Sequence, residues 1–139
     1  IKKLCTQYNG TFLYASNFSI GVNMFFKLNI ELAKLMQDKI YTTSISETHH
    51  LEKLDKPSGT AKTLSKDIQK ELKITPNIIS HRVENKIGTH EIKYASEIDN
   101  IKIVHEAKTR DGFAYGALLA AEWIRNKKGI FSMQDVLSL

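Results

Sequence analysis

The feature that most constrains the fold is a change of pattern in the middle of the chain. Residues 41–48, YTTSISET, have the β-branched, alternating character of a strand. From Thr60 to about Leu72 the apolar residues recur at helical spacing, and Pro76 then breaks the helix. Three further strand patterns follow, at about 78–83, 89–96 and 100–107. This succession predicts an α+β fold with an open mixed sheet of about four strands packed against helices.

Two more helices are expected on either side of this region. From Ser19 to about Met36 the apolar positions again have helical spacing, and Ser19 or Asn17 can cap the N-terminus. These positions are Val22, Phe25, Leu28, Leu32 and Leu35. The stretch 111–129 is rich in small residues and ends in Lys127, Lys128 and Gly129, which favours a helix C-terminus there. The short turns between the last three strands indicate an antiparallel meander joined to the earlier strand.

The first fifteen residues predict a helix end, a turn at Asn9-Gly10 and a short strand, TFLYA. A lone strand cannot make a sheet, so its missing neighbours indicate that the chain begins inside a larger protein. The first residue, Ile1, is not Met, and no opening apolar run is long enough for a signal peptide or a membrane span.

Composition excludes several function classes. The net charge of +5 comes mainly from lysines that are scattered among acidic residues, whereas a nucleic-acid surface needs clustered charge. A small anionic substrate fits the same sign. Cys5 is the only cysteine, so it can form no internal disulfide or cysteine zinc site, and a cytoplasmic location is expected. We therefore expect no nucleic acid and no membrane among the partners.

The candidate site is the stretch 47–62, ETHHLEKLDKPSGTAK. A histidine titrates near neutrality and can give or take a proton, while Lys53 can pair with an anionic ligand or donate a proton. A zinc site is weakly supported, because His49 and His50 are adjacent and point to opposite faces of a strand. A metal hydrolase built on Glu47, His49 and His50 is an alternative that predicts stoichiometric metal.

The Pro-Ser-Gly-Thr turn of this stretch predicts an anion cradle. Pro57 is a stiff turn residue, Gly59 allows close backbone approach, and Thr60 lies in the first turn of the helix. Backbone N–H groups at a helix N-terminus suit a carboxylate or phosphate. Ser58 could equally be only an N-cap, and both roles can hold together. The spacing of a nucleotide-hydrolysing phosphate loop is absent.

The other histidines, His81, His90 and His105, lie within predicted strands. A lone histidine in a strand is more often a packing or surface residue than a ligand. We therefore assign these three no catalytic role.

The run ETHHLEKLDKPSGTA resembles the signature of the dihydrodipicolinate reductase family of the bacterial lysine and diaminopimelate pathway. Two other stretches are similar to family segments: ASNFSIGVN at 15–23 resembles the link from the nucleotide domain to the substrate domain, and RDGF at 110–113 resembles the return. The resemblance covers essentially the whole chain.

The resemblance implies a two-domain reductase that uses NADH or NADPH and assembles into a homotetramer through the sheet of its substrate domain. It divides the chain into a nucleotide-domain remnant and hinge at 1–18, a substrate-binding and tetramerisation domain at 19–109, and a return segment at 110–139. The substrate implied is a cyclic dicarboxylate. The chain alone is expected to be inactive.

The family's roles transfer by position. His49 and Lys53 resemble the catalytic proton-transfer residues. The resemblance also implies substrate-binding residues, namely His50, Lys53, Ser58, Gly59 and Thr60. It implies cofactor-side residues, namely Ala15, Ser16, Asn17, Phe18, Arg110 and Phe113. No metal is expected.

The chain departs from the family pattern at two places. The Gly-rich phosphate loop of the nucleotide domain is absent, and Val83-Glu84-Asn85 stands where family members often carry a glycine after the arginine. The alternative from another function class is a non-catalytic oligomerisation or dicarboxylate-binding module that keeps the loop only as an anion cradle.

Overall fold

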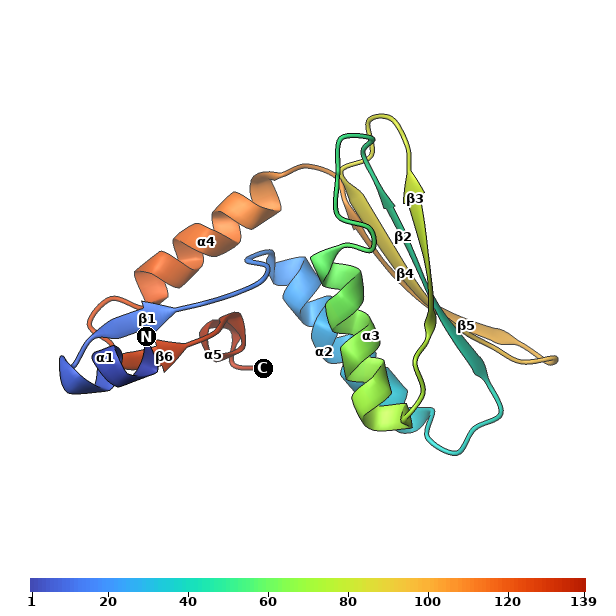
Figure 1. The fold of residues 1–139 in the computed structure, drawn as a ribbon, viewed down its shortest axis with the longest axis horizontal. Coiled ribbons are helices and arrows are strands. Elements are labelled where there is room, and N and C mark those ends of the chain that lie inside the picture. The colour runs from blue at the N-terminus through green and yellow to red at the C-terminus, as the bar shows by residue number, and fades with distance from the viewer. The chain divides into compact units, whose positions relative to one another are not determined.

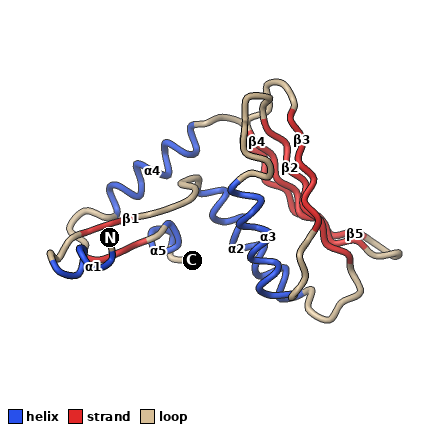
Figure 2. The backbone as a smooth tube through the Cα atoms, in the orientation of Figure 1, coloured by secondary structure: helices blue, strands red, loops and turns tan.

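The computed structural model describes all residues, 1–139, and they form two compact units. One unit comprises 1–23 together with 110–139, and the other comprises 24–109. Figures 1 and 2 show the elements of each unit. None of the helices is both long enough and apolar enough to cross a membrane.

The unit 24–109 contains every element predicted for it. Helix α2 spans Ile20–Leu35 and contributes its residues from Met24 onward. The other elements are β2 (Thr42–His49), α3 (Gly59–Leu72), β3 (Asn77–Arg82), β4 (Gly88–Ala95) and β5 (Asn100–Ala107). Their boundaries lie within one residue of the predicted ones, because period-two and helical patterns are local properties of the sequence.

The strand order corrects the predicted meander. The sheet runs β3-β2-β4-β5, so β2 lies between β3 and β4, which do not pair with each other. Strands β2 and β3 are parallel, whereas β2 with β4 and β4 with β5 are antiparallel. Helix α3 is the crossover that returns the chain to a parallel neighbour of β2, as parallel pairing requires. Strand β3 is thereby an edge strand.

One face of the sheet is covered by helices. Figure 1 shows α2 and α3 side by side along this face. Alternate residues of β2 and β4 point toward the layer between the sheet and these helices, and Ile45, Ile92 and Tyr94 are fully buried there. Leu64 and Ile68 of α3 are also fully buried. This layer is the core of the unit, and the opposite face of the sheet carries mostly polar side chains.

The predicted apolar face of α2 is confirmed in part, because Val22 and Phe25 are buried and Leu32 is half-buried. Leu28 and Leu35 are 50% and 72% exposed. Phe26, which was not predicted, is buried, and so is Asn29, whose Nδ2 donates to the carbonyl of Leu64 at 3.1 Å. A fully buried amide bound to α3 helps to fix which face of α2 points inward, and Leu28 and Leu35 lie outside that face.

The unit formed by 1–23 and 110–139 contains a two-stranded parallel sheet. Its elements are α1 (Lys2–Gln7), β1 (Thr11–Leu13), α4 (Asp111–Trp123), β6 (Gly129–Phe131) and α5 (Met133–Leu137). Strand β1 pairs with β6, which the sequence patterns did not predict, so the first strand does have a neighbour in this chain. The core of this unit gathers around Ala120, Met133 and Val136.

Helix α4 ends earlier than predicted. Its last residue is Trp123, and Gly129 begins β6 with a φ of 127°. The lysines at 127 and 128 therefore follow the helix, and Lys127 Nζ lies 4.3 Å from the centre of the Trp123 ring. The contact of the Lys127 ammonium with the Trp123 indole stabilises this turn, at a place where the sequence predicted the C-terminus of the helix.

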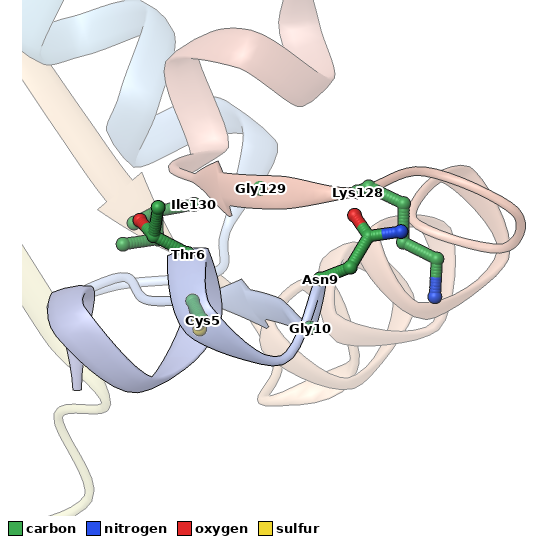
Figure 3. A pocket seen from close by; sticks show the side chains of 7 residues that line it. All are labelled: Cys5, Thr6, Asn9, Gly10, Lys128, Gly129 and Ile130. Carbon is green, nitrogen blue, oxygen red and sulfur yellow. The ribbon is translucent and has the colours of Figure 1, made fainter.

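A cavity of about 320 Å³ lies beside α1 and β6. Figure 3 shows Cys5, Thr6 and Gly10 on one side of it and Lys128 to Ile130 on the other. Lys128 and Cys5 are its only ionisable side chains. This cavity offers no constellation for catalysis.

Candidate active site

The end of β2 carries a buried carboxylate. Glu47 is fully buried, so its charge needs partners to offset the loss of water. The backbone N–H of Ser58 donates to both carboxylate oxygens, at 3.1 and 3.0 Å, and Arg82 Nη2 lies 3.3 Å from Oε1. Burial raises the pKa of Glu47, but hydrogen bonds from Ser58 and Ser80 and the nearby His49 bring it below its ordinary value. Glu47 is therefore an anion at neutral pH.

Arg82 ties the loop after β2 to strand β3. Its Nε donates to the carbonyl of Lys53 at 3.2 Å, and its Nη2 donates to the carbonyl of Asp55 at 2.6 Å. The side chain also contacts the carboxylate of Glu47. In the pairing of β2 with β3, Arg82 lies opposite His49. Figure 2 shows the loop in tan between β2 and α3. Arg82 thus holds the backbone that carries Lys53.

Ser58 caps helix α3, which confirms one of its two predicted roles. Its Oγ accepts from the N–H of Ala61 at 3.2 Å. Gly59 is exposed, and a Cβ placed on it would meet no atom within 4 Å, so the space beside it is open. The positive end of the helix dipole faces this space. Anion binding by Gly59 and Thr60 remains a prediction. We call Glu47 to Thr60, with Arg82 and His90, the β2–α3 corner.

His49 has protein partners at both ring nitrogens. Its Nδ1 lies 3.3 Å from the carbonyl oxygen of Ile87, and its Nε2 lies 3.3 Å from His90 Nε2 and 3.5 Å from Glu47 Oε2. Only about a tenth of the side chain is exposed. Burial lowers the pKa of His49, and the charges of Lys53 and Arg82 add to this, while Glu47 opposes it. His49 is therefore mainly neutral at pH 7.

His90 is the second histidine of the corner. It is 4% exposed, its ring is 5.0 Å from that of His49, and its Nε2 lies 3.2 Å from Ser58 Oγ. Burial lowers its pKa to about 4. Sequence patterns placed His90 in a strand but could not place it here, because its position depends on the pairing of Glu47 with His90 across β2 and β4. Gly88, also missed, leaves room for the ring of His49.

His50 and Lys53 lie on the accessible side of the corner. Their side chains are 28% and 23% exposed. His50 Nδ1 is 2.9 Å from Glu52 Oε2, and Lys53 Nζ is 2.6 Å from Asp55 Oδ1. The Lys53 ammonium lowers the pKa of Asp55. Both predicted ligand-binding residues thus already hold a carboxylate, which is the group they are expected to bind in a substrate.

Glu47, His49 and His90 could also hold a metal ion, since one ligand atom from each lies within 4.8 Å of the others. Two histidines and a carboxylate are a common ligand set for zinc. The metal alternative raised above used His50 as the third ligand, but His50 is outside this buried group. The carboxylate of Glu47 and Nε2 of His90 already have Ser58 as a partner. The expectation of no metal remains a prediction.

The residues predicted to face a cofactor lie in the other unit. Ala15 to Phe18 follow the carboxyl end of β1, and Arg110 and Phe113 begin α4. The two stretches meet within this unit: Gly116 of α4 lies directly against the carbonyl of Phe18, and Gly112 lies beside Ser19. The structure therefore brings the predicted cofactor-side residues together, while their role remains a prediction.

Comparison with known proteins shows which family the chain belongs to. The model for the C-terminus of dihydrodipicolinate reductase matches residues 21–137. The 4-hydroxy-tetrahydrodipicolinate reductase of Christiangramia forsetii is 47% identical over 150 residues, which cover 99% of this chain and 63% of that protein. The enzyme of the same name from Wigglesworthia glossinidia brevipalpis is 41% identical over 128 residues, which cover 90% of this chain and 48% of that protein. The chain thus spans between about half and two thirds of these relatives.

A solved structure has the same fold. The dipicolinate-bound dihydrodipicolinate reductase from Paenisporosarcina sp. TG-14 superposes with a TM-score of 0.71 at 21% identity, covering 96% of this chain and 57% of that one. At this identity the likeness concerns the fold, and it confirms the predicted α+β class. Sequence and fold agree, and the chain belongs to the dihydrodipicolinate reductase family, whose C-terminal part it matches.

Proposed function

We propose that this chain is the substrate-binding part of a reductase that converts 4-hydroxy-tetrahydrodipicolinate into tetrahydrodipicolinate with NADH or NADPH, in lysine and diaminopimelate biosynthesis. The observation that carries the proposal is the β2–α3 corner. It holds the partly exposed side chains of Lys53 and His50 and the N-terminus of α3, where the space beside Gly59 is open. The named relatives support the same reaction.

The chemistry of the corner suits a ring that carries two carboxylates. The ammonium of Lys53 and the imidazole of His50 would bind one carboxylate, and they now hold Asp55 and Glu52. The N-terminal turn of α3, with Gly59 and Thr60, would bind the other. Substrate would thus replace the chain's own carboxylates at the accessible side of the corner.

Proton transfer in this proposal rests on Lys53 and His49. Reduction by hydride leaves electron density on the substrate that a nearby donor must neutralise. Lys53 is the accessible donor, and Arg82 holds its backbone in place through the carbonyl of Lys53. His49 lies behind it in the buried network with Glu47.

The residues present fit one end of a nicotinamide nucleotide. In parallel sheets such cofactors bind beyond the carboxyl ends of the strands, which is where Ala15 to Phe18 follow β1. Arg110 and Phe113 begin α4 in the same unit and would complete this contact. The phosphate-binding Gly-rich turn is not among the residues of this chain. The nucleotide would supply the hydride.

Assembly and location are further parts of the proposal. The open face of the sheet, which carries Glu91, Lys102 and Val104, would pack against other copies to form a homotetramer. Light scattering on a size-exclusion column would give the assembled mass, and a monomer at micromolar concentration would contradict this part. A cytoplasmic enzyme fits the lone, unpaired Cys5.

The first test is calorimetric titration of the 139-residue chain with dipicolinate, a planar dicarboxylate. We expect binding that is weakened at least tenfold by Lys53→Met, because one charge-assisted contact is lost. Lys34→Met removes an exposed lysine of α2 that pairs with Glu31, and it should leave affinity unchanged. Equal affinity in all three proteins, or no binding by the parent, would contradict the proposed substrate site.

The second test separates the reductase from the non-catalytic module. In a protein that combines this chain with a nucleotide-binding domain, Lys53→Ala and His49→Ala should each lower turnover by orders of magnitude with the fold intact. His81→Ala, in edge strand β3, is the control. The chain alone should oxidise no NADH. Near-normal turnover in both variants would exclude the assigned roles and favour the module.

A further inference from the structure

The proposed function leaves open what sets the protonation state of His49, and the structure points to His90. We propose that His90 is a positioning residue whose Nε2–H donates to His49 Nε2, so that His49 is held in one tautomer and takes up its proton on the side facing Glu47. This inference rests on the proposed function only for its catalytic meaning. The hydrogen-bond arrangement stands on the geometry alone.

The tautomer of neutral His49 follows from its partner at Nδ1. The carbonyl oxygen of Ile87, 3.3 Å away, can only accept, so Nδ1 carries the hydrogen. Nε2 of His49 is then an acceptor. It faces Nε2 of His90 at 3.3 Å, and two bare nitrogens at that separation would repel each other. His90 must therefore carry its hydrogen at Nε2.

The other nitrogen of His90 supports the same tautomer. His90 Nδ1 is buried and has no hydrogen-bond partner. An unpaired buried N–H is rarer in proteins than an under-satisfied acceptor, so a bare Nδ1 is the less costly choice. Ser58 Oγ, 3.2 Å from His90 Nε2, offers a second acceptor for the same hydrogen. The pair therefore has one consistent arrangement of hydrogens while both rings are neutral.

Charged groups around the pair decide where an added proton goes. Glu47 approaches Nε2 of both rings, at 3.5 Å from His49 and 3.7 Å from His90. Burial and the charges of Lys53 and Arg82 oppose protonation of His49. Burial, the neighbouring His49, His105 of strand β5 and Lys53 oppose protonation of His90. Glu47 is the only anion among them. A proton gained at His49 Nε2 is thus stabilised by Glu47, and His90 must then turn its own hydrogen toward Ser58 or Glu47.

The hydrogen bond from His90 stabilises the neutral form of His49, and this stabilisation changes the pKa of His49. A bond made to the neutral form lowers the pKa of the acceptor. Replacing His90 by leucine removes that bond, whereas glutamine keeps an N–H donor of similar reach. The pKa of His49 should therefore rise in the leucine variant and change little in the glutamine variant.

The experiment is nitrogen-15 NMR of the histidine-labelled 139-residue chain. Long-range correlations report which ring nitrogen carries hydrogen. Above the pKa of both rings we expect hydrogen on Nδ1 of His49 and on Nε2 of His90. Hydrogen on Nε2 of His49, or on Nδ1 of His90, would overturn the inference. This readout needs no substrate, so failure of the proposed reductase function and failure of this inference give different results.

The same spectra, recorded over a range of pH, test the positioning role. We expect His90→Leu to raise the pKa of His49 by about half a unit or more, and His90→Gln to keep it near the parent value. His81→Leu, in strand β3, is the control for a histidine lost elsewhere on the sheet. An unchanged pKa in the leucine variant would overturn the role. If that variant does not fold, a rise of about half a unit or more in the pKa of His49 in the glutamine variant would overturn the role instead.

Discussion

The backbone N–H of Ser58 donates to both carboxylate oxygens of Glu47, although the two residues are 11 positions apart. This contact fastens the N-terminus of α3 to the end of β2. Arg82 of β3 reaches the same carboxylate and also holds the loop between the two elements. One buried anion therefore fixes the backbone that carries both Lys53 and the proposed anion cradle.

Glu47→Gln should destabilise the unit by about 3 kcal/mol, because Arg82, whose side chain is only 13% exposed, loses its counter-charge and an amide cannot accept at both positions. Urea unfolding at pH 7 measures this. Glu91→Gln, which breaks a partly exposed pair with Lys102, should cost less than about 1 kcal/mol. Equal costs for the two variants would show that Glu47 does not hold the corner together.

Gly88→Ala should displace the ring of His49. A Cβ on Gly88 would lie 3.0 Å from Cε1 and 3.1 Å from Nδ1 of that ring, so the ring must give by a few tenths of an ångström. We expect a changed nitrogen-15 shift at His49 Nδ1 and a loss of stability of about 1 kcal/mol. Gly10→Ala, where the nearest contact is 3.5 Å, is the control. An unmoved His49 signal would contradict the tight fit.

Gly116→Ala should strongly destabilise the unit formed by 1–23 and 110–139. A Cβ there would overlap the carbonyl of Phe18, which is backbone and cannot swing away. The expected loss is about 3 kcal/mol or more by thermal or denaturant unfolding. Gly112→Ala, in the same helix but with an ordinary 3.8 Å contact to Ser19, should be neutral or stabilising. A tolerated Gly116→Ala would mean that α4 does not pack against Phe18.

Asp67 should make stability depend on pH. Burial raises its pKa from the ordinary 3.8 to about 6. The positive charge of Lys70 opposes this rise, and the negative charge of Glu71 adds to it. Because the folded state holds the proton more tightly than the unfolded state, stability is lost as pH rises from about 4 to about 6. Asp67→Asn removes this dependence and should stabilise the chain by about 1 to 2 kcal/mol at pH 7, since the side chain is only partly buried.

The measurement for Asp67 is urea unfolding at pH 4.0 and pH 7.0 for the parent and the variant, with both pH values chosen to bracket the raised pKa of about 6. Asp38→Asn, at an exposed position after α2, is the control. A variant that gains no stability at pH 7 relative to pH 4 would contradict the raised pKa.

Purified protein should contain no stoichiometric metal, although Glu47, His49 and His90 present a plausible ligand set. The carboxylate is engaged by Arg82, whose positive charge opposes a metal cation at the same site. Elemental analysis of protein prepared without chelators measures this. One zinc per chain, lost in His90→Leu, would show that the trio is a metal centre.

Much of the site was open to prediction from the sequence. His49, Lys53 and the Ser58 cap lie within a continuous stretch, and strand and helix patterns on each side place that stretch at the end of one element and the start of the next. Local pattern could not find Arg82 or His90, because both reach the corner through strand pairing. It also misjudged part of the inner face of α2, where Asn29 is buried and Leu28 is exposed.

The sequence by itself determined the elements of the unit 24–109, the fold class and the loop that carries the chemistry, since alternation, helical spacing and turn residues are encoded within short segments. Only the tertiary structure decided that β2 lies between β3 and β4, which brings Arg82 and His90 to Glu47 from opposite sides. The physical reason is that strand order and register depend on contacts between distant segments and on the α3 crossover. No local pattern reports those contacts.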